Sequence, residues 1–417
     1  MRFLFTTIPG LGHLHPMLPI AQALVHAGHD VAFACAKSFC RHITAQGIPC
    51  FPAGLDWLES YADEAFPEIA AIPLEQRLSH WLVTEVFADA AAYDMVPDLL
   101  RICTDWQPDV LVRNDFEFGA CIVAERLGIP NAVVGMETYL PSYVWDPLIS
   151  EPLAYIRSVY GLNPYPPLEM IMPDLYLACS PSSYHLPDFP LPSVAQMVRP
   201  AFFDQNDGET LPDWVADLPA QPTLYVTLGT VYNQAPDVFE MVVSALRDEP
   251  INVIMTLGSG PLPESDSLKA PNIHIERYIP QTLLLPHCDA AIIHGGFQTT
   301  LSVLGHGLPL VTVPISATDP LRAIRCMDLG VGIVLRYGEN TSNEANPLWQ
   351  FAAPENTKQH QPFTEETIHN SVRSVLHDQR FRSNAEAFRQ TLQDLHGMES
   401  AVARLTSLTK HKQSVVA

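Results

Sequence analysis

Short apolar runs alternate along the chain with longer segments in which apolar residues recur at helical spacing. The first such unit has an apolar run at 2–7, a helical segment at 17–27 that ends at Gly28, and a second apolar run at 30–36. A strand, a helix and a second strand in this order predict a βαβ unit, with parallel strands and a right-handed crossover. The same pattern returns at 109–134 and predicts a second unit of this kind.

A polar break near the middle of the chain interrupts this alternation. Prolines, glycine and acidic residues crowd the stretch 199–222 and favour no regular element. A second series of apolar runs then starts at 223–230 and continues to 310–313. Two successive α/β halves of similar size predict two Rossmann-like domains with parallel sheets facing a cleft. We place an N-terminal domain at 1–205, a linker at 206–222, a C-terminal domain at 223–385 and a last helix at 386–417.

The composition narrows the class of partners. The chain carries 46 acidic and 23 basic residues, for a net charge of −23. Because nucleic acids and anionic membranes attract basic patches, we expect neither as a partner. No apolar run reaches the roughly 18 residues of a membrane span, and the first residues predict a strand and not a signal peptide. Cys35, Cys121 and Cys179 lie in apolar runs, which predicts buried thiols and a reduced, cytoplasmic setting.

The densest candidate chemistry lies in the second series. An apolar run at 290–293 ends at His294, after which Gly295 and Gly296 lead into a Thr-rich apolar helix. Glycines let backbone approach a ligand closely, and a helix N-terminus offers N–H groups that suit a phosphate. A histidine there adds a donor, and a carboxylate such as Asp319 on a later loop can bind hydroxyls. These groups together suit a nucleotide sugar; the alternative is an ordinary strand–turn–helix joint.

The run from Tyr278 through His294 to Asp319 resembles the donor-binding signature of GT-B glycosyltransferases of family 1. That group includes plant secondary-product and bacterial antibiotic glycosyltransferases. The resemblance implies an α/β fold of the GT-B type, with closing helices that cross back onto the first domain. It also implies a nucleoside-diphosphate sugar, UDP- or dTDP-linked, as the donor substrate.

The resemblance further assigns roles within the donor site. It implies that Thr230 contacts the diphosphate, that Tyr278 and Ile279 meet the nucleobase edge, and that His294 contacts the pyrophosphate. It also implies that Gly296, Gln298 and Thr299 line the helix start and that Asp319 binds the sugar hydroxyls. Gln298 replaces the Gly or Asn usual in the family. Pro320 stands where Gln is common, so one contact to the sugar is expected to be missing, which leaves room for a deoxysugar.

A second candidate site follows the first strand, where Gly12 and His13 precede His15 and Pro16. Ligands of open parallel sheets bind beyond the carboxyl ends of strands, and a histidine with a pKa near ~6.5 suits a general base. From the residues alone, His13 is also compatible with a turn residue or with a His-x-His metal pair that lacks a third ligand. The segment is similar to the catalytic-histidine loop of the family, which implies that His13 is the base. Gly12, in an incomplete glycine fingerprint, is counted with the donor-binding residues.

A base histidine needs an acid that orients it. Members of the family carry Asp at the position of Asn114, and in this chain Asp115 follows one step later. We expect Asp115 to be the acid; in the alternative, Asn114 orients the ring without stabilising its charge.

The acidic residues predict no metal site. No carboxylate pair at DxD spacing follows an apolar strand, and Glu264 and Asp266 lie in a proline-rich loop, so we expect no metal and no other cofactor.

Aromatic residues concentrate at 57–93 and 139–165, which predicts an apolar pocket for a flat or polycyclic molecule.

These observations favour an inverting, metal-independent glycosyltransferase, with a hydroxyl of a hydrophobic small molecule such as a polyketide, macrolide or flavonoid as acceptor. Two alternatives remain: a non-catalytic nucleotide-sugar-binding partner protein, and a GT-B nucleotide-sugar epimerase or cell-wall sugar transferase. The expected state is a monomer or a homodimer.

Overall fold

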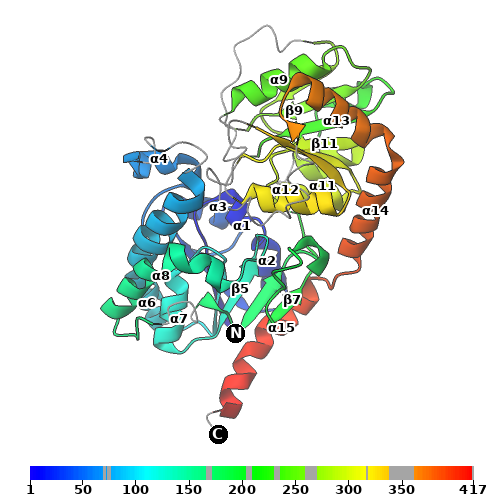
Figure 1. Ribbon diagram of the computed structural model, residues 1–417. Coiled ribbons are helices and arrows are strands. Elements are labelled where there is room, and N and C mark those ends of the chain that lie inside the picture. The colour runs from blue at the N-terminus through cyan, green and yellow to red at the C-terminus, as the bar shows by residue number, and fades with distance from the viewer. Residues whose placement is uncertain are drawn as a thin grey trace. The chain divides into compact units, whose positions relative to one another are not determined.

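The computed structural model describes residues 1–68, 72, 77–165, 171–202, 209–229, 235–258, 270–315, 318–337 and 361–415, with backbone alone at 77–80 and 410–415. The chain divides into two compact units (Figure 1). The first combines Met1–Ala201 with Leu395–Ala417, and the second is Phe202–Asp394. Each unit is built on a seven-stranded sheet, and every strand pair in both sheets is parallel, which confirms the predicted α/β class.

The first sheet has the order β3-β2-β1-β4-β5-β6-β7. Its strands are β1 (Arg2–Thr6), β2 (Asp30–Cys35), β3 (Cys50–Pro52), β4 (Val110–Asn114), β5 (Asn131–Gly135), β6 (Leu175–Ala178) and β7 (Ala195–Met197). The central strands β1, β4 and β5 are buried almost throughout, as expected for a parallel sheet covered on both faces. Helix α2 ends at His26, two residues before Gly28, whose φ of 82° stops the helix as predicted.

The helices of this unit are α1 (Leu11–Leu14), α2 (Leu18–His26), α3 (Cys40–Thr44), α4 (Ala62–Ala65), the π-helical η3 (Arg77–Ala91), α6 (Ala92–Trp106), α7 (Gly119–Leu127), α8 (Ser142–Val159) and α15 (Met398–Val415), with short 3₁₀ turns η1 (Glu59–Tyr61) and η5 (Ser182–Tyr184). The C-terminal helix α15, red in Figure 1, contacts α2, β4 and β6. The chain end therefore completes the unit in which the chain begins.

The second sheet has the order β10-β9-β8-β11-β12-β13-β14. Its strands are β8 (Thr223–Thr227), β9 (Asn252–Thr256), β10 (Ile273–Glu276), β11 (Ala290–Ile293), β12 (Leu310–Thr312), β13 (Gly332–Arg336) and β14 (Gln361–Pro362). The helices are α9 (Pro236–Leu246), α10 (Gln281–Leu284), α11 (Phe297–Gly305), α12 (Asp319–Asp328), α13 (Glu365–His377) and α14 (Gln379–Gln393), with 3₁₀ turns η6 (Asp213–Asp217) and η8 (Leu285–His287).

Helices cover both faces of this sheet. Apolar residues of α9 and α13 join strand residues in one large core, whereas Ala323 and Ile324 of α12 pack on Val334 of β13. Figure 1 shows α9 and α13 on one side of the sheet and α11 and α12 on the other. Because side chains alternate along a strand, Val334 and its neighbour Leu335 serve opposite cores.

The unit boundaries differ from the predicted ones at two places. The segment 386–417 is not one helix, because the end of α14 belongs to the second unit, where α14 contacts α11. The segment expected as a linker contains η6, whose Trp214 stacks on His274 with ring centroids 4.5 Å apart. Glu264 and Asp266, the acidic residues of the proline-rich loop, lie outside the described residues.

The cysteines depart in part from the expectation of reduced thiols. Cys35, Cys121 and Cys179 are buried and unbridged, as predicted, and burial raises the pKa of Cys35 and Cys179 to about 12. Cys40 and Cys50, however, form a disulfide, with the Sγ of Cys35 3.6 Å from that of Cys50. Within the described ranges, no helix combines the length and the hydropathy that crossing a bilayer requires.

Candidate functional site

His13 lies beyond the carboxyl end of the first strand, on the short helix α1. Strand β1 pairs in parallel with β4, so residues that follow the two strands meet at one edge of the sheet. Asn114 ends β4 and Asp115 follows it. The structure therefore brings the three residues expected in the catalytic site to one edge of the first unit.

The hydrogen-bond partner of His13 is a residue that sequence reasoning missed. Nε2 of His13 lies 3.3 Å from Oε1 of Glu59, and both side chains are nearly buried, with exposed fractions of 11% and 9%. The backbone N–H of Glu59 donates to the carbonyl of Pro9 at 3.1 Å, which ties η1 to the histidine loop. A Cβ on Gly10 would collide with the Glu59 carboxylate. No local motif marks Glu59, which lies 46 residues from His13.

The environment of His13 makes it a stronger base than a free imidazole. Burial alone would lower its pKa, but the charge and the hydrogen bond of Glu59, with smaller contributions from Glu137 and Asp115, raise the pKa above the ordinary value of 6.5. Within the described ranges, Nδ1 is buried without a hydrogen-bond partner. The ring thus carries one nitrogen held by a carboxylate and one buried nitrogen without a hydrogen-bond partner among the described residues.

The side chain of Asn114 forms hydrogen bonds with Thr7 and with the backbone that follows β4, and not with His13. Its Oδ1 accepts the backbone N–H groups of Phe116 and Glu117, both at 2.9 Å, and its Nδ2 donates to Oγ1 of Thr7 at 2.9 Å. This is the local side-chain-to-backbone bonding that Asn favours at turns. With both ends of its amide engaged, Asn114 fastens β4 to the segment that follows β1.

The carboxylate of Asp115 is also engaged away from the histidine. Its Oδ2 accepts the backbone N–H of Met136 at 2.8 Å, and a hydrogen bond links it to the Tyr176 hydroxyl. Asp115 acts on His13 only through space, as the smallest of three carboxylate contributions. His13 is therefore hydrogen-bonded to Glu59, and not to Asp115 or Asn114, the two residues expected as its partner.

Aromatic rings surround the histidine. The rings of Phe87 and Phe116 stand edge-on to the imidazole, with centroids 6.2 and 6.0 Å away. Phe87 contacts Trp57, and Phe116 contacts Trp145. Trp57 and Phe87 come from one aromatic-rich stretch of the sequence and Trp145 from the other, and Phe116, which lies between the two stretches in the sequence, contacts Phe87 and Trp145.

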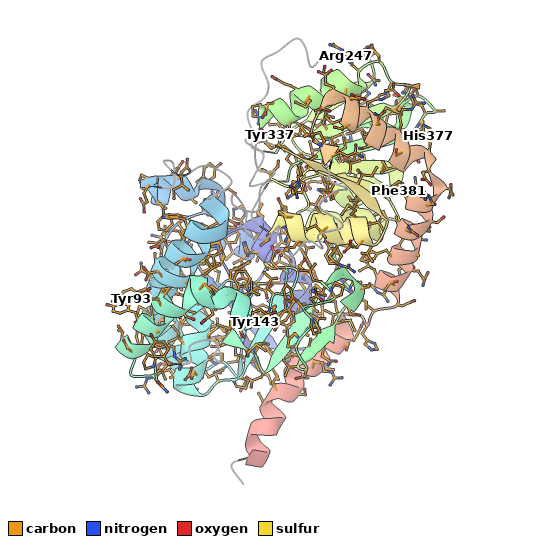
Figure 2. All side chains as sticks on the ribbon, viewed as in Figure 1. Tyr93, Tyr143, Arg247, Tyr337, His377 and Phe381 are labelled. Atoms are coloured by element: carbon orange, nitrogen blue, oxygen red, sulfur yellow. A yellow bond between two sulfur atoms is a disulfide. The ribbon has the colours of Figure 1, made fainter. Side chains whose placement is uncertain are left out.

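A pocket opens on the Phe116 side of this cluster. Its volume is about 600 Å³, solvent at its mouth included, and its wall includes Phe116, Tyr139, Leu140, Trp145, Met172 and Tyr176, with Arg113, Asp115 and Glu137 as its charged residues. Other aromatic residues of the same stretches lie at the surface, as Figure 2 shows for Tyr93 and Tyr143, which are 41% and 64% exposed. The expected apolar pocket is therefore formed by only part of the aromatic residues.

His294 follows β11 in the second unit and is buried between two glycines. A Cβ on Gly296 would collide with Nε2 of His294, and a Cβ on Gly229 would lie 2.7 Å from Cε1. Gly229 also has a φ of 78°, which disfavours other residues. The two glycines therefore make the space for the imidazole ring, which is a more specific role than the turn chemistry visible in the sequence.

At His294, unlike at His13, the nearby charges do not outweigh the effect of burial on the pKa. Burial lowers the pKa of His294; Asp319 raises it and the guanidinium of Arg322 lowers it further, and the net pKa lies below 6.5. Its Nδ1 is buried and has no hydrogen-bond partner among the described residues. A neutral ring with one N–H is suited to donate a hydrogen bond to an anion.

Arg322, which the sequence did not single out, holds this loop in place. Its Nε donates to the carbonyl of Gly295, its Nη1 to Thr318, and its Nη2 to Oδ1 of Asp319 at 2.6 Å. Asp319 is 1% exposed, and its Oδ2 accepts the N–H of Ile315 at 3.3 Å. The carboxylate expected to bind sugar hydroxyls thus takes part in a buried ion pair at the start of α12.

The remaining donor-site residues are placed as follows. Gly296 is the N-cap of α11, and no side chain caps the N–H groups of the first turn. Gln298 and Thr299, which lie in that turn, are partly exposed. Tyr278 is 50% exposed, whereas Ile279 is 1% exposed and belongs to the core. Gly12 has nothing within 4 Å of an added Cβ. Thr230 lies outside the described residues.

Comparisons with known proteins agree on one family. The model of the N-terminal domain of erythromycin biosynthesis protein CIII-like proteins matches residues 22–229, and the model of their C-terminal domain matches residues 240–355. The chain is 29% identical to 4'-demethylrebeccamycin synthase of Lentzea aerocolonigenes, over 93% of this chain and 94% of that protein.

Two solved structures have the same fold. Glycosyltransferase VinC, in complex with dTDP, superposes with a TM-score of 0.75 at 21% identity, over 99% of this chain and all of that one. Spinosyn rhamnosyltransferase SpnG, complexed with spinosyn aglycone, superposes with a TM-score of 0.73 at 20% identity, over 97% of this chain and 100% of the other.

Proposed function

The chain belongs to the erythromycin biosynthesis protein CIII-like family of GT-B glycosyltransferases, and we propose that it transfers a sugar from a dTDP-linked donor to a hydroxyl of an apolar natural-product aglycone. The observation that carries the proposal is the pair of buried histidines at strand ends, one with its pKa raised by a carboxylate and one kept neutral. The first suits proton abstraction and the second suits phosphate binding.

His13 acts as the general base. It accepts the proton of the acceptor hydroxyl while the oxygen attacks the anomeric carbon of the donor. The bond from that carbon to the diphosphate breaks, and its electron pair leaves with the nucleoside diphosphate. A single displacement of this kind inverts the configuration at the anomeric carbon. The raised basicity of His13 supports this role, since a stronger base takes a hydroxyl proton more readily.

His294 and the start of α11 hold the departing diphosphate. The imidazole contributes one N–H, and the uncapped first turn contributes backbone N–H groups and the positive end of the helix dipole. These donors supply charge stabilisation without a metal ion. The ring of Tyr278, which is half-exposed, stacks on the nucleobase in this proposal, and Ile279 contributes backbone alone because its side chain is buried.

The sugar meets residues near the start of α12. Asp319 accepts hydrogen bonds from sugar hydroxyls, and Gln298 and Thr299 complete the helix start. Pro320 offers no amide to the sugar, which favours a deoxysugar donor, and the dTDP bound to VinC supports dTDP as the carrier.

The pocket beside Phe116 receives the acceptor. Its apolar and aromatic wall suits a flat or polycyclic aglycone, and Phe116 links it to the His13 ring. The aglycone bound to SpnG supports an acceptor of this class. The hydrogen bond between His13 and Glu59 argues against a non-catalytic binding protein, which has no use for a base of raised strength.

Calorimetry and product analysis test the proposal. Wild-type protein should bind dTDP, and His294→Ala should weaken binding by about 1.5–3 kcal/mol, because a hydrogen bond to a charged group is lost. A panel of dTDP- and UDP-sugars with polycyclic aglycones, analysed by mass spectrometry, should yield glycosides from a dTDP donor. A protein that binds neither dTDP nor UDP would overturn the proposal.

A further inference from the structure

Three separate features of the fold converge on Glu59. Its backbone N–H is bonded to the carbonyl of Pro9, its carboxylate lies 3.3 Å from Nε2 of His13, and the missing side chain of Gly10 leaves room for that carboxylate. Gly10 has a φ of −139° and a ψ of 142°, a conformation open to any residue. The glycine at this position is therefore explained by the space that Glu59 occupies and not by its backbone conformation.

We propose that Glu59 is the positioning acid of the active site: its carboxylate fixes the orientation and tautomer of His13 and stabilises the imidazolium formed when His13 takes the acceptor proton. The proposal rests on the function proposed above. With Glu59 on Nε2, the proton of the neutral ring sits on Nε2, and the lone pair of Nδ1 receives the acceptor proton. The resulting cation then has an N–H already directed at a carboxylate.

Competing acids lie nearby and are distinguished by their bonds. The charged groups that act on His13 are Glu59, Glu137 and Asp115, and only Glu59 adds a hydrogen bond to its charge. Asp115 is engaged by Met136 and Tyr176, as described above. Phe87 and Phe116 pack against the ring and contribute no charge. The strength of the base should therefore depend mainly on Glu59.

Five variants test this assignment, and Glu59→Asp, which keeps the charge on a shorter side chain, is the conservative one. Glu59→Gln removes the charge and keeps the shape, and Gly10→Ala displaces the carboxylate with a methyl group while leaving Glu59 itself unchanged. Glu64→Gln is the matched control, since Glu64 is an exposed carboxylate on the neighbouring α4. Asp115→Asn tests the competing acid. Affinity for dTDP and melting temperature verify that each variant is folded.

The first readout is the pH dependence of kcat/KM. In Glu59→Gln the inflection should move to lower pH, because a neutral partner no longer favours the imidazolium, and the plateau should fall by roughly tenfold to a hundredfold. Gly10→Ala should shift the profile in the same direction, and Glu59→Asp should restore part of the rate. Glu64→Gln should match the wild type. A wild-type profile in Glu59→Gln, or the full shift in Asp115→Asn, would overturn the proposal.

The second readout needs no substrate and separates this proposal from the proposed function. The pKa of His13, followed by NMR with ¹³C-labelled histidine and assigned with His13→Gln, should fall in Glu59→Gln and stay unchanged in Glu64→Gln. A fall in protein that transfers no sugar would refute the proposed function and uphold the pairing. Normal transfer with an unchanged His13 pKa in Glu59→Gln would refute the role of Glu59 and leave the proposed function standing.

Discussion

His13 in the first unit and His294 in the second have similar surroundings and opposite chemistry. Both follow the end of a strand in a parallel sheet, and both are 8% exposed. Burial lowers the pKa of each ring, yet the net pKa of His13 is raised and that of His294 is lowered. The difference comes from their neighbours: His13 has a hydrogen-bonded carboxylate, whereas near His294 the guanidinium of Arg322 opposes the charge of Asp319 and burial prevails.

This comparison shows what a strand-end histidine alone does not determine. The position offers a polar group to a ligand, and the balance of burial and adjacent charge decides whether the group takes protons or remains neutral. The carboxylate of Glu59 stabilises the cation of His13 and so raises its pKa, whereas the lowered pKa of His294 keeps that ring neutral at pH 7, where its N–H can serve a phosphate. The same residue type thereby suits two different steps of one transfer reaction.

Removal of His13 should have the largest effect. His13→Ala should lower turnover by about 10²–10⁴-fold, the usual contribution of a general base, while dTDP affinity stays at the wild-type value. Acceptors with acidic phenolic hydroxyls should lose less, since they need the base less. Steady-state rates together with calorimetry check both points. Comparable turnover in the variant would remove His13 from the catalytic step.

Filling the glycine space at His294 should have the next largest effect. In Gly296→Ala the new methyl group collides with the imidazole, and overpacking of this kind costs about 1–3 kcal/mol. The ring must move, so dTDP affinity should fall by roughly tenfold to a hundredfold. Calorimetry gives the affinity, and the melting temperature separates local displacement from unfolding. Unaltered affinity in a folded variant would show that the ring position does not matter for the nucleotide.

Substitutions at the end of β4 should affect stability more than catalysis. Asn114→Ala removes an amide that serves three buried partners, so the free energy of unfolding should fall by about 1–3 kcal/mol. The pH at which activity rises should stay close to wild type, in both this variant and Asp115→Asn. Urea unfolding and a pH profile of kcat/KM measure the two quantities. A strong loss of turnover in a stable Asp115→Asn protein would restore Asp115 as the acid.

The structure also shows which parts of this comparison the sequence could predict. Periodicity predicted the strands because each is a buried apolar run; β11 begins and ends where expected. His294 and its glycines were found because they are adjacent in sequence. Glu59 was missed because its contact with His13 spans a long stretch of chain and is set by the packing of η1 on the histidine loop. The bonds of Asp115 and Asp319 to distant groups were invisible for the same reason.

The break between α14 and α15 illustrates a further limit. Ala385, Phe388 and Leu392 are buried at helical spacing along α14, but this spacing could not show that the chain leaves the second unit after α14. The composition of the junction carries no strong stop, and the division follows from what each helix contacts.

Chelation of metals should have the smallest effect. Leaving-group charge in this account is balanced by His294 and the start of α11, so activity in excess EDTA should match activity in buffer alone. Rates measured with and without added Mg²⁺ complete the comparison. Loss of activity in EDTA that Mg²⁺ restores would show that a metal ion, and not His294 and the start of α11 alone, balances the charge of the leaving diphosphate.

The most direct test is to titrate both histidines in one experiment. NMR of ¹³C-labelled histidine in the unliganded protein, with His13→Gln and His294→Gln for assignment, gives the two pKa values under identical conditions. We expect a pKa above 6.5 for His13 and a pKa below 6.5 for His294. Equal values, or the reverse order, would contradict the division of base and phosphate donor between the two units.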